Sequence, residues 1–377
     1  MDAVQKKSRL KKNINATFVT TFAAAILALF LMPFLFMVLT SLKTPNQIMV
    51  LGSPIYPAMP ASFTYEGDST AEYTFQIEKG GRMVDEVISM PEFVGETLDV
   101  YSVPMEDGSM RSLALMKGAN SASIFLDPDD PEEPPFVWVG YYKGLERPWS
   151  FSPSWSNYET VWNDINYPRI LWNTFFYAFF TTVGVLFSCV LVAFGFSRFR
   201  FPGRDFLFVV LISTIFLPGA VTIIPQFTFF SQIGWVGSWL PLIIPSFFAN
   251  AYDTFLLRQY FMTLPRELDE AAMIDGASPL RVLWSVILPQ SYAAIVAVSI
   301  FHIVWAWNDY FGPLIYLSTK MENQPVSVAL ARFNGMYGRQ PQAIQAGALM
   351  TIIIPMILFF AAQRFFIQGI VITGVDK

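Results

Sequence analysis

Long apolar runs separated by short polar loops dominate the pattern of this chain. A transmembrane helix needs roughly 20 predominantly apolar residues, and six runs reach that length. They cover residues 17–42, 170–196, 206–230, 238–257, 289–317 and 343–366. The pattern therefore predicts an all-α membrane protein with six transmembrane helices.

The stretch between the first two runs follows a different pattern. Apolar and polar residues alternate over residues 73–77 and 111–115, as in half-buried strands, and residues 136–139 form a third strand-like run. Gly80 and Gly81 suit the turn of a hairpin. We expect a small β-rich domain at about residues 60–145, with a flexible acidic loop as the alternative.

These patterns divide the chain into three parts. Residues 1–45 hold an N-terminal tail and the first helix, and residues 46–165 form the insertion. Residues 166–377 form a five-helix core that includes a polar loop at about 263–289.

Composition narrows the possible functions. Hydrophobic residues make up 54% of the chain and charged residues 14%, whereas soluble globular proteins carry about 25% charged residues. A soluble enzyme and a nucleic-acid-binding protein are therefore disfavoured. With one cysteine (Cys189) and one histidine (His302), a zinc site or a Ser-His-Asp triad is hard to build on this chain.

The distribution of charge predicts the orientation in the membrane. Thirteen lysines and arginines lie in the two terminal segments and in the loops after the second and fourth runs, against three in the opposite short loops. Cytoplasmic loops carry the excess of Lys and Arg, so both termini should be cytoplasmic. The segment between Lys43 and Arg169 has a net charge of −11 and should lie outside. The first run is too long for a signal peptide and lacks an A-x-A-like site, so we interpret it as an uncleaved span.

The loop at 263–289 carries strong local signals. Pro265 followed by Glu267, Asp269 and Glu270 suits the start of a helix. Gly276 suits the position just after its end, and Ser278-Pro279 suits the cap and first residue of a second helix. The sequence predicts a helix-turn-helix at the cytoplasmic membrane face, with a small patch at Ala271 and Ala272 that would let another protein approach closely.

These residues resemble the EAA loop of ATP-binding-cassette importer permeases. That loop has E-A-A, three residues, G, nine residues and I-x-L-P. Here the residues are Glu270-Ala271-Ala272, then Gly276, then Val286-Ile287-Leu288-Pro289. Residues 155–158 with Trp162, 171–174 and 196–203 also resemble this family, residues 305–313 resemble its carbohydrate branch, and residues 362–364 and 369–377 resemble the tail of MalG-type sugar permeases. The resemblance covers roughly residues 1–50 and 150–377, and the insertion is longer than the family leads us to expect.

The resemblance implies a type I importer (MetI-like) fold in the prokaryotic plasma membrane. It implies a permease subunit that pairs with a MalF-like second permease, an ATPase dimer and an extracytoplasmic solute-binding protein. The chain lacks G-x-x-x-x-G-K-[ST], so ATP and Mg are expected on the partner ATPase, and the chain itself is not expected to be an enzyme. The substrate would be a sugar or oligosaccharide; the alternatives are a non-sugar solute of the same superfamily and, distantly, a secondary transporter.

The resemblance also implies roles for particular residues. Contact with the ATPase would fall on Glu270, Ala271, Ala272, Gly276, Leu288 and Pro289. The tail at 369–377 would reach the ATPase dimer as well. Separately, the loop at 318–342 is short, polar and between the fifth and sixth runs, so we expect it to lie outside and to touch the binding protein.

Three residues in the fifth run are candidates for a substrate path. Asn308 and Asp309 are polar residues expected in the middle of that run, and Trp307 is one of several aromatic residues around them. An intramembrane carboxylate is costly and by default functional. The alternative is a structural helix–helix bond made by Asp309 near the outer mouth.

Overall fold

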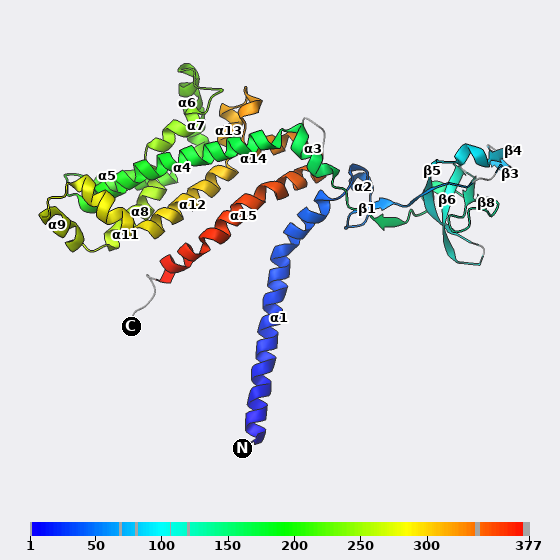
Figure 1. The fold of residues 1–377 in the computed structure, drawn as a ribbon, viewed down its shortest axis with the longest axis horizontal. Helices are drawn as coiled ribbons and strands as arrows, with labels where there is room; N and C mark the ends of the chain where they lie inside the picture. Colours follow the sequence, from blue (N-terminus) through cyan, green and yellow to red (C-terminus); the bar gives the residue numbers. More distant parts are fainter. Residues whose placement is uncertain are drawn as a thin grey trace. The chain divides into compact units, whose positions relative to one another are not determined.

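The structure is a computed structural model that describes residues 2–67, 70–79, 82–105, 107–118, 121–335 and 340–371. The predicted turn at Gly80 and Gly81 and the end of the tail at 372–377 lie outside the described residues. The chain divides into two compact units, Met1–Trp155 and Ser156–Lys377, and Figure 1 shows the elements of each.

The first unit begins with a long helix and continues into β structure. Helix α1 spans Asp2–Ser41, and its described side chains are exposed over most of its length, as expected of a helix whose apolar surface faces lipid. The short helix α2 (Pro45–Met49) follows. The strands are β1 (Ala58–Pro60), β2 (Ser62–Thr64), β3 (Glu72–Lys79), β4 (Arg82–Ser89), β5 (Thr97–Pro104), β6 (Met110–Gly118), β7 (Ala122–Leu126), β8 (Phe136–Val139) and β9 (Trp149–Phe151).

The strands form three antiparallel groups. The largest is a five-stranded sheet in the order β2-β5-β6-β7-β8, and β3-β4 and β1-β9 form two further pairs. One face of the sheet buries Ile124, Leu126 and Ala114 beneath residues from β3 and β4, and the other buries Phe125 and Leu113. Successive residues on a strand face opposite sides, so β7, which is buried throughout, contributes to both cores.

The second unit is helical. Its longer helices are α3 (Ser156–Asp164), α4 (Tyr167–Arg198), α5 (Arg204–Ser213), α6 (Gly219–Gln232), α8 (Ala251–Thr263), α9 (Glu267–Ile274), α12 (Tyr292–Asn308) and α15 (Pro341–Val371). Short pieces connect them: α7 (Leu240–Ile243), α10 (Pro279–Val282), α11 (Leu288–Gln290), α13 (Phe311–Tyr316) and α14 (Val326–Leu330), with single turns at Thr214–Phe216, Ile244–Phe247, Met321–Asn323 and Ala331–Asn334. Helix α4 is the central element, because α8 and α12 both pack on it.

Over the described residues, four helices are long and apolar enough to cross a membrane, or up to six if each of two bent pairs is one span. The four are Thr17–Ser41, Tyr167–Arg198, Leu240–Thr263 and Pro341–Gln363. The bent pairs are Arg204–Phe216 with Val221–Gln232, and Pro279–Gln290 with Tyr292–Asn308. The exact number of six spans predicted from the sequence therefore depends on how the bent pairs are counted.

The fifth apolar run is not one continuous helix, which corrects the expectation that Asn308 and Asp309 lie in the middle of a helix. Helix α12 ends at Asn308, and Asp309 has an extended backbone. Pro313 lies four residues later, where its ring would clash with the Asp309 carbonyl in a continuous helix. That carbonyl instead accepts a hydrogen bond of 2.6 Å from the Ser327 hydroxyl.

Candidate functional site

The segment at 263–289 forms a helix, a turn and a second helical stretch. Helix α9 begins at Glu267 and has three acidic residues in its first turn, where negative charge is favoured by the helix dipole. Its last turn closes with the Gly276 amide donating to the Met273 carbonyl at 3.0 Å and the Ala277 amide donating to the Ala272 carbonyl at 2.9 Å. This is the Schellman pattern, so Gly276 has the position that its sequence context predicts.

Gly276 is required by its backbone conformation. Its φ is +83°, and a Cβ added there would meet nothing within 4 Å. A side chain at this position would therefore be strained by the left-handed backbone rather than by a collision. The exposed turn around it is free to approach another surface.

The second helical stretch begins as the sequence predicts. The Ser278 hydroxyl accepts a hydrogen bond from the Arg281 amide at 3.4 Å, and Pro279 is the first residue of α10. A short π-helical stretch, Leu283–Ile287, then leads into α11.

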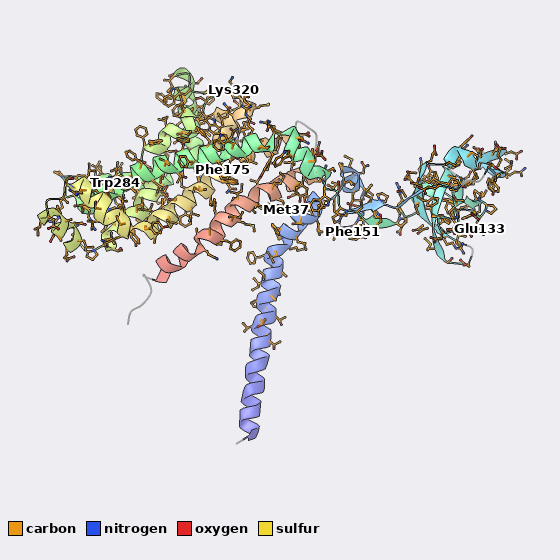
Figure 2. The ribbon with its side chains drawn as sticks, viewed as in Figure 1. Met37, Glu133, Phe151, Phe175, Trp284 and Lys320 are labelled. Carbon is orange, nitrogen blue, oxygen red and sulfur yellow. The ribbon has the colours of Figure 1, made fainter. Side chains whose placement is uncertain are left out.

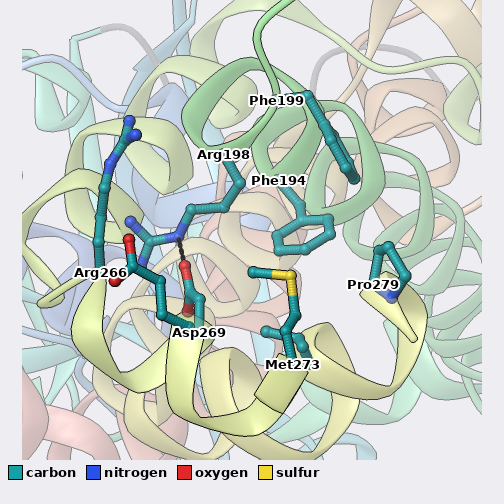
Figure 3. Close-up of a pocket in the computed structure, with 9 residues that line it drawn as sticks. Phe194, Arg198, Phe199, Arg266, Asp269, Met273 and Pro279 are labelled. Carbon is teal, nitrogen blue, oxygen red and sulfur yellow. Dashed lines mark ion pairs between the residues drawn. The ribbon is translucent and has the colours of Figure 1, made fainter. Parts of the chain in front are cut away.

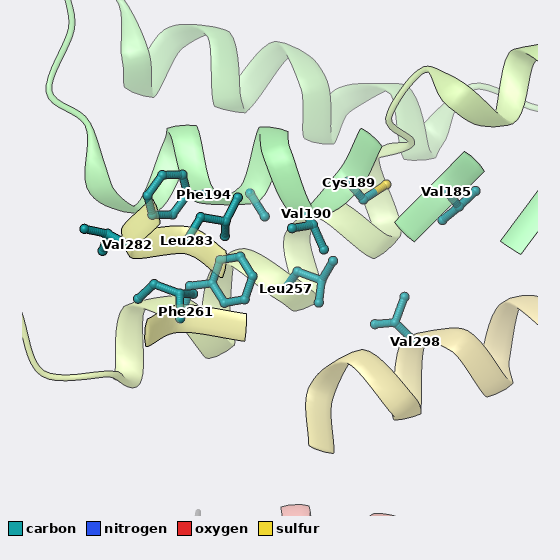
Figure 4. Close-up of a cluster of buried hydrophobic side chains, with 11 residues drawn as sticks. Val185, Cys189, Val190, Phe194, Leu257, Phe261, Val282, Leu283 and Val298 are labelled. Atoms are coloured by element: carbon teal, nitrogen blue, oxygen red, sulfur yellow. The ribbon is translucent and has the colours of Figure 1, made fainter. Parts of the chain in front are cut away.

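An apolar core fixes this stretch to the helical unit. Val282, Leu283 and Ile287 are buried in one cluster with Phe194 of α4 and Phe261 of α8, as Figure 4 shows for most of them. Fully burying one such side chain contributes about 1.5–3 kcal/mol. The second half of the segment is thus held by several hydrophobic contacts.

Helix α9 is held differently, by a buried ion pair. Arg198 Nε, at the end of α4, lies 2.8 Å from Asp269 Oδ2, and the two side chains are only 7% and 8% exposed (Figure 3). The Arg198 guanidinium also donates to the Leu264 carbonyl at 3.3 and 3.4 Å. Burial raises the pKa of the Asp269 carboxyl, and the positive charge of Arg198 opposes that rise. The pair ties the first helix of the segment to the end of α4.

A cavity of about 200 Å³ lies between the end of α4 and the segment. Figure 3 shows Phe194 and Arg198 on the α4 side and Asp269 and Met273 on the α9 side. The cavity is lined by both apolar and charged side chains. Two polar contacts join α4 to the start of α9 here: the Arg198–Asp269 pair and a hydrogen bond of 3.5 Å from the Arg266 guanidinium to the Ser197 carbonyl.

The outer surface of the segment is rich in exposed apolar side chains. Ile274 at the end of α9 is 86% exposed, and Leu268, Leu280 and Trp284 are exposed as well. Clusters of exposed apolar residues rimmed by polar ones mark protein interaction sites. Acidic Glu267 and Glu270 lie on the same short helix.

The candidate residues of the EAA resemblance are distributed along this segment. Glu270, Ala271 and Gly276 are exposed on α9 and its turn, whereas Ala272 packs against the apolar cluster. Leu288 packs against the same cluster and Pro289 is exposed, both in α11 at the far end of the segment. The structure therefore brings the first four together and leaves the last two apart.

Sequence reasoning missed Arg198 and Asp269 as a pair. Asp269 lies three residues before Ala272, so the two share the inner face of α9. The sequence predicts a patch at Ala272 that faces another protein, so nothing in the local sequence indicated that Asp269 faces inward or that Arg198 is its partner.

The second candidate set lies at the end of α12. Trp307 is buried, with its ring edge-to-face with Phe175 at 5.3 Å between centroids. Asn308 is exposed, and its amide donates to the Val304 carbonyl at 2.8 Å. Tyr177 of α4 donates its hydroxyl to Asp309 Oδ2 at 2.7 Å. The Tyr177–Asp309 hydrogen bond joins α4 to the end of α12, as in the structural alternative. The substrate-path role stays a prediction.

Comparison with known proteins decides the family. The family described as "Binding-protein-dependent transport system inner membrane component" matches residues 184–372, which include the whole 263–289 segment. The chain belongs to this family. It is therefore a membrane component of a binding-protein-dependent transport system.

Two relatives illustrate the match. The sn-glycerol-3-phosphate transport system permease protein UgpE of Salmonella typhi is 34% identical over 226 residues, which are 57% of this chain and 79% of the relative. The osmoprotective compounds uptake permease protein GgtD of Synechocystis sp. is 33% identical over 186 residues, 49% of this chain and 62% of the relative. This chain thus matches less than two thirds of the length of GgtD.

A solved structure shares the fold. A chain of a bacterial ABC transporter involved in the import of the acidic polysaccharide alginate superposes with a TM-score of 0.59 at 18% identity, covering 95% of this chain and 97% of that one. The permease fold expected from the sequence is supported, together with a β-rich N-terminal region.

Proposed function

We propose that this chain is one of two permease subunits of an ATP-driven importer for a carbohydrate or a related polyol or sugar phosphate. The observation that carries the proposal is the surface formed by helix α9 and its Gly276 turn. This surface is exposed and presents both acidic and apolar side chains. The helix itself is tied to α4 by the Arg198–Asp269 pair. This surface has the composition of a protein docking site.

The partner at this surface is an ATPase subunit, which would hold ATP and Mg. The EAA residues Glu270, Ala271 and Gly276 lie on the exposed part of the segment and are available for that contact. A MalF-like permease would complete the translocation path, and an extracytoplasmic binding protein would deliver the solute. The excess of Lys and Arg in the terminal segments and in the loops around this segment supports a cytoplasmic location for it and for both termini.

The substrate class rests on the relatives. UgpE is named for sn-glycerol-3-phosphate and GgtD for osmoprotective compounds, and both names are compatible with small polyhydroxylated solutes. A panel of sugars, polyols and their phosphates, tested for binding to the co-encoded binding protein and for uptake into vesicles that contain the full complex, would assign the solute. Uptake of an amino acid or a metal instead would refute the carbohydrate class and leave the permease assignment intact.

The coupling role is tested by Gly276→Val. The valine forces a β-branched residue into a left-handed backbone, which costs roughly 1–2 kcal/mol and distorts the turn. We expect loss of uptake and weaker binding of the ATPase. Gly203→Val is the matched control, because Gly203 has φ +77° and equally open surroundings in the turn before α5. Wild-type uptake and subunit association in Gly276→Val, or an equal loss in Gly203→Val, would contradict the proposed role.

A further inference from the structure

Two stretches of the insertion carry no charge at all. Residues 44–65 and 148–158 contain no Asp, Glu, Lys or Arg, whereas the residues between them, 66–147, contain 17 acidic and 6 basic residues. The two neutral stretches meet in space, because β1 pairs with β9, with Ala58 opposite Phe151. We call residues 44–60 and 148–151 the neutral collar.

The neutral collar is tied directly to the end of α1. The Lys43 ammonium donates to the Pro54 carbonyl at 2.8 Å. The buried Gln47 side chain donates to the Pro54 and Tyr56 carbonyls at 3.1 and 2.7 Å and accepts from the Ala58 amide at 3.0 Å. These bonds hold the collar next to the point where α1 ends.

The outer surface of the neutral collar is apolar. Leu51 is 101% exposed at the tip of a turn, next to Gly52 with its φ of +83°. Phe151 is 70% exposed, and Met49 and Ile55 are exposed as well. The ring of Tyr56 lies 6.5 Å from that of Phe151, centroid to centroid. Transfer of these apolar side chains from water to an apolar environment would be favourable.

We propose that the neutral collar inserts into the headgroup–acyl boundary of the outer leaflet and contacts lipid. The apolar part of α1, Thr17–Ser41, has 25 residues, about 37 Å of helix, against a hydrocarbon core of roughly 30 Å. A span of that length delivers its end, and the collar after it, to the boundary of the membrane.

The composition of the collar fits that location. An absence of charge removes the desolvation cost of entering the interface, and Tyr56 and Trp149 are of the aromatic types that gather there. The 23 charges of residues 66–147 keep the rest of the insertion in water. The lipid contact would therefore set the height of the β-rich region above the membrane, independently of which solute is carried.

A depth-sensitive fluorophore tests the proposal. Leu51→Cys would be labelled with nitrobenzoxadiazole in the purified full chain, together with any subunits that copurify, and reconstituted in phosphatidylcholine vesicles containing lipid spin-labelled near the headgroup. Glu133→Cys, an exposed position among the acidic residues before β8 (Figure 2), is the matched control. The native Cys189 is buried, and wild type treated with the same reagent reports any reaction there.

We expect the spin-labelled lipid to reduce the emission at position 51 at least twofold and to leave position 133 unchanged. A label at Phe151→Cys should show the same reduction of emission as the label at position 51. This second position checks that the result does not depend on the surroundings of one label. No reduction of emission at position 51, or an equal reduction at positions 51 and 133, would overturn the proposal. So would protection of position 51 by a copurifying subunit, shown by a crosslink from it, because the surface would then be a protein contact.

Discussion

Replacing Asp269 by asparagine should release α9 from α4. The substitution keeps the size of the side chain but removes its charge, so the Arg198 guanidinium stays buried without its counter-ion. The apolar core beneath α10 and α11 does not include α9, apart from the half-buried Ala272. The perturbation is therefore confined to the first helix of the 263–289 segment.

The magnitude follows from the burial of the pair. Removing one partner of a buried ion pair costs about 3–5 kcal/mol. Arg198 retains its contacts with the Leu264 carbonyl and borders a cavity, so the lower end, about 3 kcal/mol, applies. That free energy corresponds to roughly a 100-fold increase in the local opening of α9.

Hydrogen exchange of the backbone amides measures that opening. We expect the α9 amides in Asp269→Asn to exchange about two orders of magnitude faster than in the wild type, and the α8 amides to change little. Glu270→Gln is the matched control, since Glu270 is exposed and its neighbour in sequence. The double variant Arg198→Met with Asp269→Leu should recover most of the protection, because an apolar pair can replace a buried ion pair.

Two results would refute this reasoning. Unchanged exchange of α9 in Asp269→Asn would mean that other contacts hold the helix. Equal acceleration in Glu270→Gln would mean that negative charge near the helix start, rather than the buried pair, stabilises it.

Three further outcomes are expected. Tyr177→Phe removes the hydroxyl that donates to Asp309 and should lower the stability of the helical unit by about 1.5–3 kcal/mol; an unchanged thermal midpoint with altered solute affinity would instead favour a substrate-path role. Asn334→Cys should crosslink to the binding protein in an ATP-trapped complex, whereas labelling from the cytoplasmic side alone would reverse the proposed topology. Replacing residues 65–135 by a short Gly/Ser linker should weaken binding-protein affinity with the complex still assembled, and unchanged affinity and uptake rate would remove the docking role of the β-rich region.

Local signals account for what the sequence could predict. Gly276 predicts the end of α9, and Ser278-Pro279 predicts the start of α10. Each of these signals depends only on residues within one helical turn. The apolar runs likewise indicated where the long helices lie, because lipid-facing and core-facing positions are both apolar in a membrane protein. Strands β3, β6 and β8 were found through their alternation or strand-like run.

Features that depend on distant residues could not be predicted. Helix α12 ends at Asn308 because the ring of Pro313 would clash with the Asp309 carbonyl in a continuous helix. The Ser327 hydroxyl, from another helix, donates a hydrogen bond to that carbonyl instead. Strand β7 is buried on both faces, and a short continuous apolar run cannot be distinguished from a helical piece by periodicity. The pairing of Arg198 with Asp269 likewise joins two helices that are far apart in the sequence.

The attachments of the 263–289 segment explain how a movement at its surface would reach the membrane. Its first helix is tied to the end of α4 by the Arg198–Asp269 pair, and its second half continues through α11 into α12. The Tyr260 hydroxyl of α8 also donates to the Gln290 carbonyl of α11 at 3.2 Å. A displacement of α9 by a docked partner would thus act on α4 through the Arg198–Asp269 pair and the Arg266–Ser197 hydrogen bond, and on α12 through the chain itself. Because packed helices move as rigid bodies rather than deform, the segment is placed to change the relation between these two helices.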